Sequence, residues 1–360
     1  MGRSRTAASR HRTRPLAPEP MKDRPMKPLK TLAALPALAG LLALTGCAGS
    51  EAASASSGNG DKQTVVVRIP DPGNAGALAL GKKDGSLAAA LKKVNAEVEW
   101  TGSRGPFAPA AQALNADQLD IATGSITSGV TALTQKPGFK IFTATDPDLA
   151  GEGILVKKDS GINKVQDLVG KKVAVNEGGT GEYLLLKALA EHDIPEEKVE
   201  RVYLRPDQTA SVYKTGQVDA WAVWAAYSVA ELGSGDSRFL ADGAAVGSDN
   251  YNFYAVRTGF AEKHPEVLKA LYRYLHDASV EERRSPEKYL NVTTDKGPTA
   301  VTGKAKEIQA DILRKAGTVE PVEADDIKRF EAVAQFYLDQ KVTKTKVEIE
   351  PHVLDIEELT

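Results

Sequence analysis

The residues of this chain that could bind a ligand gather in glycine-rich loops, and the most informative of these loops begins at Glu177. It reads Glu-Gly-Gly-Thr-Gly and joins the expected strand Lys172–Asn176 to an amphipathic helix. Glycine lets backbone N–H groups approach a ligand, Thr180 can cap the helix, and the helix start carries a partial positive charge. The loop therefore predicts an anion site at Gly179, Thr180 and Gly181. The same residues are equally consistent with a capped helix start that holds no ligand.

Three other loops follow expected strands, at the strand ends where open α/β sheets bind their ligands. The candidate residues in these loops are Gly76, Ala77, Arg104, Gly124 and Ser125. Arg104 could bind an anion through two parallel hydrogen bonds, or it could be an ordinary solvated arginine. Trp221 lies on an expected strand, where it either lines a pocket or belongs to the core, as most strand tryptophans do.

The sequence lacks the motifs that enzymes of common classes need. It has no Gly-x-Ser-x-Gly elbow, no His-Glu-x-x-His helix and no Gly-x-x-x-x-Gly-Lys loop, and its five histidines are scattered. We therefore expect no catalytic residues, no metal site and no cofactor, and interpret the chain as a binding protein.

The candidate loops belong to an alternation of short β-branched runs and helical patterns, which predicts parallel sheets covered by helices. The expected strands are Val65–Ile69, Val98–Thr101, Ile121–Thr123, Lys140–Thr143, Ile154–Lys157, Lys172–Asn176, Val202–Leu204, Asp219–Trp224 and Asn252–Arg257. The expected helices are Gly76–Lys83, Leu87–Lys93, Phe107–Ala116, Ile126–Gln135, Val165–Leu168, Gly181–His192, Thr209–Thr215, Ala261–Glu282, Lys304–Lys315 and Ala324–Asp339. The length of the chain and this repeated βαβ pattern predict an α/β protein with two domains.

The segment Met26–Cys47 resembles the signal of a bacterial lipoprotein. Lys27 and Lys30 form a basic start, an apolar run follows, and small residues precede Cys47, the only cysteine of the chain. We expect removal of residues 1–46 and lipidation of Cys47, which anchors the protein to the membrane. The alternatives are a buried core helix and a transmembrane span, but the apolar run is shorter than the roughly 20 residues that a span needs.

The basic residues before Met26 could bind nucleic acid, or they could precede the true start at Met21 or Met26. Residues 1–46 carry nine Lys or Arg and two Asp or Glu, so their removal changes the net charge from −2 to −9. Because an acidic chain binds nucleic acid poorly, we expect no nucleic-acid partner. Residues 47–62, rich in Ser, Ala and Gly, predict a flexible tether before the folded body.

Several blocks between residues 64 and 276 carry a family resemblance. They are Val65–Ile69, Gly76–Leu80, Ala113–Ala122, Gly153–Ser160, Val165–Val175, Tyr183–Leu185, Gly216–Trp221 and Phe260–Val267. In this order, the blocks resemble the aliphatic sulfonate, taurine and nitrate binding proteins of ABC importers.

The resemblance implies a periplasmic-binding-protein-like α/β fold of type II, with two lobes joined by a two-strand hinge near Gly153–Lys157 and Asn252–Arg257. It places residues 63–152 and 253–360 in lobe 1 and residues 153–252 in lobe 2. It implies a monomer on the extracytoplasmic face of the membrane. This protein would capture a small anionic solute in the cleft and deliver it to the transmembrane subunits of an ABC permease.

One departure from the family concerns the ligand. The family often continues the tryptophan strand as Trp-Asp-Pro, whereas Trp224 is followed here by Ala225 and Ala226. The carboxylate that could face an amine is missing, so an aliphatic sulfonate is favoured over taurine, with nitrate or bicarbonate left open. The region after Ser285 matches nothing specific.

Two alternatives remain at the level of the sequence. A binding protein for a thiamine-precursor pyrimidine would need aromatic walls, and the aromatic candidates for them are Phe107, Tyr183, Trp221 and Tyr251. The remote alternative is a pyrimidine-synthesis enzyme of the same fold.

Overall fold

The computed structural model describes residues 63–103 and 105–359. The expected signal and tether in residues 1–62, the lipidation residue Cys47 and the candidate Arg104 lie outside the described residues. Among the helices that are described, none combines the length and the apolar character that crossing a membrane requires.

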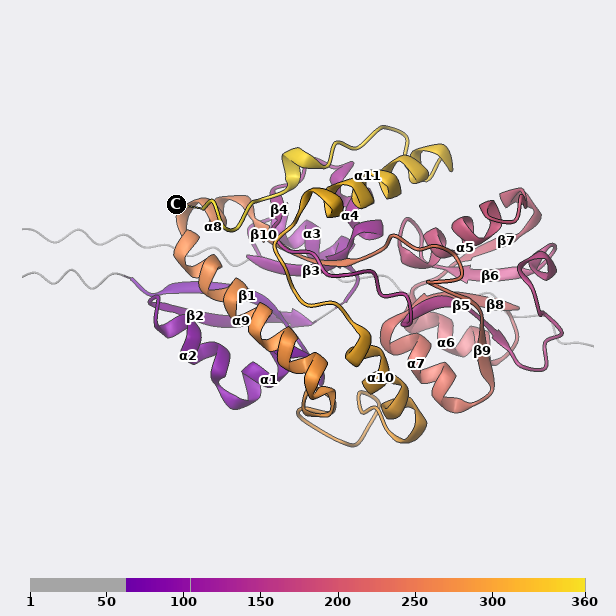
Figure 1. Cartoon of the computed structure of the whole chain (residues 1–360), viewed down its shortest axis with the longest axis horizontal. Helices are drawn as coiled ribbons and strands as arrows, with labels where there is room; N and C mark the ends of the chain where they lie inside the picture. Colours follow the sequence, from indigo (N-terminus) through magenta and orange to yellow (C-terminus); the bar gives the residue numbers. More distant parts are fainter. Residues whose placement is uncertain (1–62, 104, 360) are drawn as a thin grey trace, which may run out of the picture. The chain divides into compact units, whose positions relative to one another are not determined.

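The first part of the described chain forms two small neighbouring sheets with helices around them (Figure 1). Its elements are β1 (Val65–Asp71), α1 (Ala77–Asp84), α2 (Ser86–Lys92), β2 (Ala96–Ser103), α3 (Phe107–Asn115), β3 (Ile121–Ser125), α4 (Ile126–Leu133) and β4 (Phe139–Ile141). Strand β1 pairs in parallel with β2. A strand from much later in the chain, β10 (Asn252–Arg257), lies between β3 and β4 and is antiparallel to both.

The second part forms one five-stranded sheet in the order β7-β6-β8-β5-β9. Its elements are β5 (Glu152–Lys157), β6 (Lys172–Val175), α5 (Thr180–Ala190), β7 (Glu200–Tyr203), α6 (Pro206–Lys214), β8 (Ala220–Trp224), α7 (Ala225–Ser234) and β9 (Ser237–Asp242). Strands β6, β7 and β8 are parallel, whereas β5 is antiparallel to both of its neighbours. The fold is therefore α/β with two lobes, as expected, but of the described sheets only β1-β2 is purely parallel, β3-β10-β4 is antiparallel and the five-stranded sheet is mixed.

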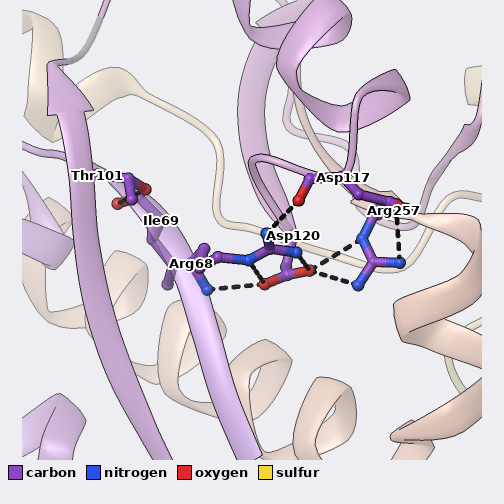
Figure 2. Close-up of polar contacts among 6 residues, drawn as sticks. All are labelled: Arg68, Ile69, Thr101, Asp117, Asp120 and Arg257. Atoms are coloured by element: carbon purple, nitrogen blue, oxygen red, sulfur yellow. Dashed lines mark hydrogen bonds and ion pairs between the residues drawn. The ribbon is translucent and has the colours of Figure 1, made fainter. Parts of the chain in front are cut away.

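A buried carboxylate joins the two small sheets of the first lobe (Figure 2). Asp120, 1% exposed, precedes β3 and accepts hydrogen bonds from the backbone and side chain of Arg68 on β1 and from the side chain of Arg257 on β10. Burial alone would raise the pKa of Asp120, but the hydrogen bonds from the two arginines hold that pKa below its usual value. Asp120 therefore links strands that have no continuous ladder between them.

The connections between the lobes differ from the expected hinge strands. Within the described residues, strand β5 pairs only with β8 and β9, and β10 pairs only with β3 and β4, so each belongs to one lobe. The chain crosses between the lobes in residues 142–151 and 243–251. Backbone hydrogen bonds from Thr145 N to Asn252 O, 3.0 Å, and from Phe142 N to Tyr254 O, 3.0 Å, hold the first crossing beside the start of β10.

The C-terminal region consists of α8 (Thr258–Lys263), α9 (Pro265–Arg284), α10 (Gly303–Lys315) and α11 (Ala324–Asp339). Helix α9 packs on α1 and α2, and α11 packs on α4, all in the first lobe. Helix α10 packs closely on α7 of the second lobe, where a β-carbon on Gly233 would come within 2.7 Å of the backbone of Ala305. The exact lobe boundaries given above stay a prediction, and the C-terminal region contacts both lobes.

One α-helix and one strand of the described chain were not expected from the sequence, and one expected helix is of a different kind. Helix α7 and strand β9 follow Trp224, and β9 pairs with β5 at the edge of the second sheet. Segment Val165–Leu168 is a single 3-10 turn. The sequence of β9, Ser-Arg-Phe-Leu-Ala-Asp, has little of the β-branched content that marks a strand, so its pairing with β5 decides its conformation.

Candidate functional site

The glycine loop at residues 177–181 precedes α5, as expected, but its internal geometry differs from the prediction. Gly178 has a φ of +61° and Gly179 is the N-cap residue of α5, with an extended φ of −128°. Thr180 is the first helical residue, so the expectation that it caps the helix is wrong. Its side chain is thereby released for other contacts.

Side chains of the loop itself already bond its backbone donors. Asn176 Oδ1 accepts a hydrogen bond from Gly181 N, 2.8 Å, and Glu182 Oε2 accepts one from Gly178 N, 2.7 Å. These two N–H groups therefore have acceptors within the protein, and the hydroxyl of Thr180 is a further polar group that the loop presents. The glycines are needed for packing: a β-carbon on Gly181 would lie 2.4 Å from Ala222 O.

The carboxylate of Glu182 holds the loop rigidly from the opposite side. It is 2% exposed and also accepts hydrogen bonds from Arg201 Nη1, 2.9 Å, and Tyr203 Oη, 2.6 Å, both on β7. Burial and the neighbouring carboxylate raise the pKa of Tyr203, so its hydroxyl keeps the proton that it donates. Glu182 therefore connects the start of α5 to the edge of the second sheet.

In the first lobe, the start of α4 carries a row of hydroxyl groups. Ser125 is its N-cap, and Ser128 Oγ accepts a hydrogen bond from Ser125 N, 3.2 Å, and donates one to Ser125 O, 2.8 Å. Ser125 Oγ lies 2.9 Å from Thr127 Oγ1. Such a serine-rich helix start satisfies backbone donors and leaves hydroxyl groups at the positive end of the helix dipole.

The two helix starts meet between the lobes. Thr180 Oγ1 lies 2.9 Å from Thr127 Oγ1 and 3.2 Å from Ser125 Oγ, and Thr131 Oγ1 donates to Gly178 O, 3.2 Å. We call Ser125, Thr127, Ser128 and Thr180 the hydroxyl cluster. Thr127 is 0% and Thr180 is 3% exposed. Neutral donors from two lobes thus converge where two helix dipoles direct their positive ends, which is an arrangement suited to an anion.

A series of hydrogen bonds connects Thr127 to the crossing segments. Asn250 Oδ1 accepts from Thr127 Oγ1, 3.1 Å, and Asn250 Nδ2 donates to Glu152 Oε2, 2.8 Å. Ser248 donates to the other oxygen of Glu152. Burial raises the pKa of Glu152, which is 1% exposed, to about 8, although the hydrogen bonds from Ser248 and Asn250 act in the opposite direction.

Helix α11 supports the glycine loop from the first lobe. Tyr337 Oη donates a hydrogen bond to Gly179 O, 2.9 Å, and the ring of Tyr183 on α5 lies edge-on to those of Phe336 and Tyr337. Tyr337 is 0% exposed, and burial raises its pKa well above the usual value. The glycine loop is therefore held by residues of both lobes.

The structure brings together some of the predicted site residues and separates others. Those at or beside the hydroxyl cluster are Gly124, Ser125, Gly179, Thr180 and Gly181. Gly76 N instead donates to Tyr289 O, 2.9 Å, and Ala77 is buried at the start of α1; neither has a hydrogen bond to the cluster in the described chain. Trp221 is 2% exposed and packs against Tyr213 in a separate apolar cluster. Arg104 is outside the described residues.

Sequence reasoning missed several residues around the cluster. These are Thr127, Ser128, Thr131, Asn176, Glu182, Asn250 and Tyr337. The Ser-x-Thr-Ser pattern at residues 125–128 is a local signal that could have found two of them. Asn250 and Tyr337 carry no local signal, because only the packing of the lobes brings them close.

Comparison with known proteins places this chain in a family and finds relatives that are named as binding proteins. A family model described as "NMT1/THI5 like" matches residues 108–288. The chain is 28% identical to the "Putative aliphatic sulfonates-binding protein" of Bacillus subtilis (strain 168), over 80% of this chain and 85% of that protein. It is 31% identical to the "Taurine-binding periplasmic protein" of Escherichia coli (strain K12), over 63% of this chain and 70% of that one.

A solved structure shares the fold. The alkanesulfonate-binding protein SsuA from Xanthomonas axonopodis pv. citri, bound to MOPS, matches with a TM-score of 0.69 and 22% identity, covering 82% of this chain and 99% of that one. These relatives are binding proteins, which is the class expected from the sequence.

Proposed function

Because this chain belongs to the NMT1/THI5-like family, we propose that it is the solute-binding protein of an ABC importer and that an aliphatic sulfonate binds at its hydroxyl cluster. The observation that carries this proposal is the convergence of Ser125, Thr127 and Thr180 from two lobes. A sulfonate presents three oxygens and one negative charge. Hydroxyl groups at two helix starts can donate to those oxygens without placing a full positive charge beside them.

Access to the cluster requires movement of the lobes. Thr127 and Thr180 are buried and bonded to each other, so a solute reaches them only when the lobes separate. A ligand favours closure through contacts that it makes with both lobes, since only these differ between the open and closed forms. Hydroxyl groups of α4 and α5 supply one set of contacts from each lobe.

The geometry favours an anion over a pyrimidine. The four aromatic side chains that a pyrimidine site would use are Phe107, Tyr183, Trp221 and Tyr251, and they do not gather at one place in the described structure. Trp221 belongs to a different apolar cluster from the other three. We therefore prefer the sulfonate, with nitrate and bicarbonate as smaller anions for the same donors.

We also propose a cellular setting for the protein. Lipidation of Cys47 would hold the protein on the extracytoplasmic face of the membrane, where it would deliver its solute as a monomer to the permease. We also propose that it has no enzymatic activity, so the bound solute leaves chemically unchanged.

Isothermal calorimetry on the purified protein tests the ligand. We expect ethanesulfonate to bind and ethanesulfonamide, a neutral molecule of similar size, not to bind. Taurine, nitrate, bicarbonate and a thiamine-precursor pyrimidine complete the panel. Tight binding of the pyrimidine without binding of any anion would contradict the proposal, and so would recovery of a modified product from the complex with ethanesulfonate.

A further inference from the structure

A continuous chain of hydrogen bonds connects the crossing segments to the hydroxyl cluster. It begins at Glu152, the first residue of β5, and passes through Asn250 on the second crossing segment to Thr127 and then Thr180. The distances are 2.8, 3.1 and 2.9 Å in that order. A buried carboxyl group is therefore three hydrogen bonds away from a hydroxyl of the proposed anion site.

The chain determines which way the Thr127 hydroxyl donates. Asn250 presents Nδ2 to Glu152 and Oδ1 to Thr127, because an ionised carboxylate can only accept. A hydroxyl has a single hydrogen, and Thr127 donates it to Asn250. Thr127 then offers only lone pairs to Ser125 and Thr180, and its hydroxyl contributes no donor to a bound anion.

A proton on Glu152 permits the opposite arrangement. A carboxylic acid protonated at Oε2 can donate to Asn250 Oδ1 after the amide turns over, and Nδ2 then donates to Thr127 Oγ1. The turned amide gives up the bond from Thr127 N, which at 3.4 Å is the longest contact of Asn250 in this chain. The hydrogen of the Thr127 hydroxyl is released toward the cluster.

We propose that Glu152 is a positioning residue for the anion site, which through Asn250 decides whether the Thr127 hydroxyl donates toward a bound anion or away from it. Protonation of Glu152 thus adds one donor and strengthens anion binding. This inference rests on the proposed function, since it concerns the same hydroxyl cluster.

The surroundings of Glu152 allow it to gain or lose a proton near neutral pH. Its side chain accepts hydrogen bonds only from the neutral Ser248 and Asn250 in the described part of the chain, and Asp148 on the first crossing segment is a like charge nearby. Burial and the charge of Asp148 raise the pKa of Glu152 to about 8. Burial also raises the pKa of Asp148 above its usual value.

The other titratable groups near Glu152 belong to α5, α11 and the second crossing segment. Asp249 lies 3.9 Å from Lys187, so its charge is balanced, and its backbone N–H donates to Tyr183 Oη. Burial raises the pKa values of Tyr183 and of Tyr337, so both stay neutral through the pH range in which Glu152 titrates.

The test is the pH profile of ethanesulfonate affinity, measured by calorimetry between about pH 6 and pH 10, where the sulfonate itself does not titrate. We expect the wild-type affinity to fall on the order of tenfold as the pH rises through about 8, which is the effect of losing one hydrogen bond to a charged group. Glu152→Gln removes the titrating proton, so its profile is expected to be flat.

A second variant distinguishes an effect transmitted through Asn250 and Thr127 from a general effect of the Glu152 charge on anion binding. Thr127→Val keeps the shape of the side chain and leaves Glu152 intact, and its profile is expected to be flat at the weaker, high-pH affinity of the wild type. It also keeps the inference testable if Glu152→Gln fails to fold. Glu231→Gln on α7 is the matched control, because Glu231 is equally buried but pairs with Lys214 and is expected to show the wild-type profile.

The outcomes are distinct. A wild-type protein that binds ethanesulfonate with a flat profile would overturn the inference, and so would a pH dependence that persists in Glu152→Gln or Thr127→Val. Absence of ethanesulfonate binding at every pH would contradict the proposed function itself, and the inference would fall with it.

Discussion

Thr127 Oγ1 and Thr180 Oγ1 lie 2.9 Å apart, although their residues are 53 positions apart in the chain and belong to different lobes. Each residue stands in the first turn of a helix, and both side chains are buried. The contact is a direct polar bond between the lobes at the place where two helix dipoles converge. Thr180 is therefore the residue whose substitution tests the proposed anion site.

Thr180→Val is expected to weaken ethanesulfonate binding about ten- to a hundredfold, because it removes a hydroxyl donor to a charged ligand. Thr180→Ser, which keeps the hydroxyl, is expected to stay close to wild type. Calorimetry at one pH measures both. Thr134→Val, at the exposed end of α4, is the control, since among the residues that the structure describes its hydroxyl bonds only the backbone of Thr131. Wild-type affinity in Thr180→Val would place the anion elsewhere.

Gly181→Ala is expected to lower the free energy of unfolding by about 1 to 3 kcal/mol, because the new β-carbon would lie 2.4 Å from the backbone oxygen of Ala222. Urea unfolding measures this change. The matched control is Gly105→Ala, since Gly105 has no atom within 4 Å of an added β-carbon and no positive φ. Equal stability of the two variants would show that α5 can move away from β8.

Asp120→Asn is expected to lower the free energy of unfolding by about 3 kcal/mol, since it leaves the partly buried guanidinium groups of Arg68 and Arg257 without their shared buried carboxylate. The lowered pKa of Asp120 means that its contribution is present above about pH 4 and is lost as the pH falls further. Denaturant unfolding at neutral and acidic pH measures both effects.

Asp117→Asn is the control for that experiment. Asp117 also pairs with Arg257, at 3.1 Å, but its side chain is 77% exposed. Exposed ion pairs contribute little, so this variant is expected to change the free energy of unfolding by less than about 1 kcal/mol. A small effect of Asp120→Asn, equal to that of Asp117→Asn, would contradict the role given to Asp120.

The raised pKa of Glu152 also predicts how stability changes with pH. The folded protein holds a proton on Glu152 up to about pH 8, whereas the unfolded chain releases it near the usual value of 4.5. The free energy of unfolding is therefore expected to fall as the pH rises from about 5 to about 8, by about 1.4 kcal/mol per unit of pKa difference. Thermal unfolding across this range measures it, and a fall that is unchanged in Glu152→Gln would assign it to other groups.

Cys47→Ser is expected to abolish membrane anchoring, because the serine hydroxyl cannot replace the thiol that lipidation requires. Membrane fractionation followed by mass determination of the wild-type and variant proteins measures the change. A processed variant that still fractionates with membranes would argue against a lipoprotein.

The α/β class and the position of the glycine loop could be predicted from local patterns. A short β-branched run, a glycine-rich loop and an amphipathic helix form a strand, a turn and a helix almost wherever they occur, so Thr180 and Ser125 were placed correctly at helix starts. The same local reasoning left two environments open for Trp221, because a strand tryptophan faces either a pocket or the core, and in the structure its side chain packs against Tyr213.

The sequence by itself determined most of the elements, though not α7 or β9, together with the family resemblance and the hydroxyl groups at two helix starts, because these depend on residues within a few positions of one another. Only the tertiary structure decided that Thr127 meets Thr180, that Asn250 joins them to Glu152, and that Tyr337 donates to Gly179 from 158 positions away. A hydroxyl or amide side chain gains only about 1 kcal/mol when it exchanges water for a protein partner, so its own sequence context does not specify that partner. The packing of two lobes across the crossing segments specifies it.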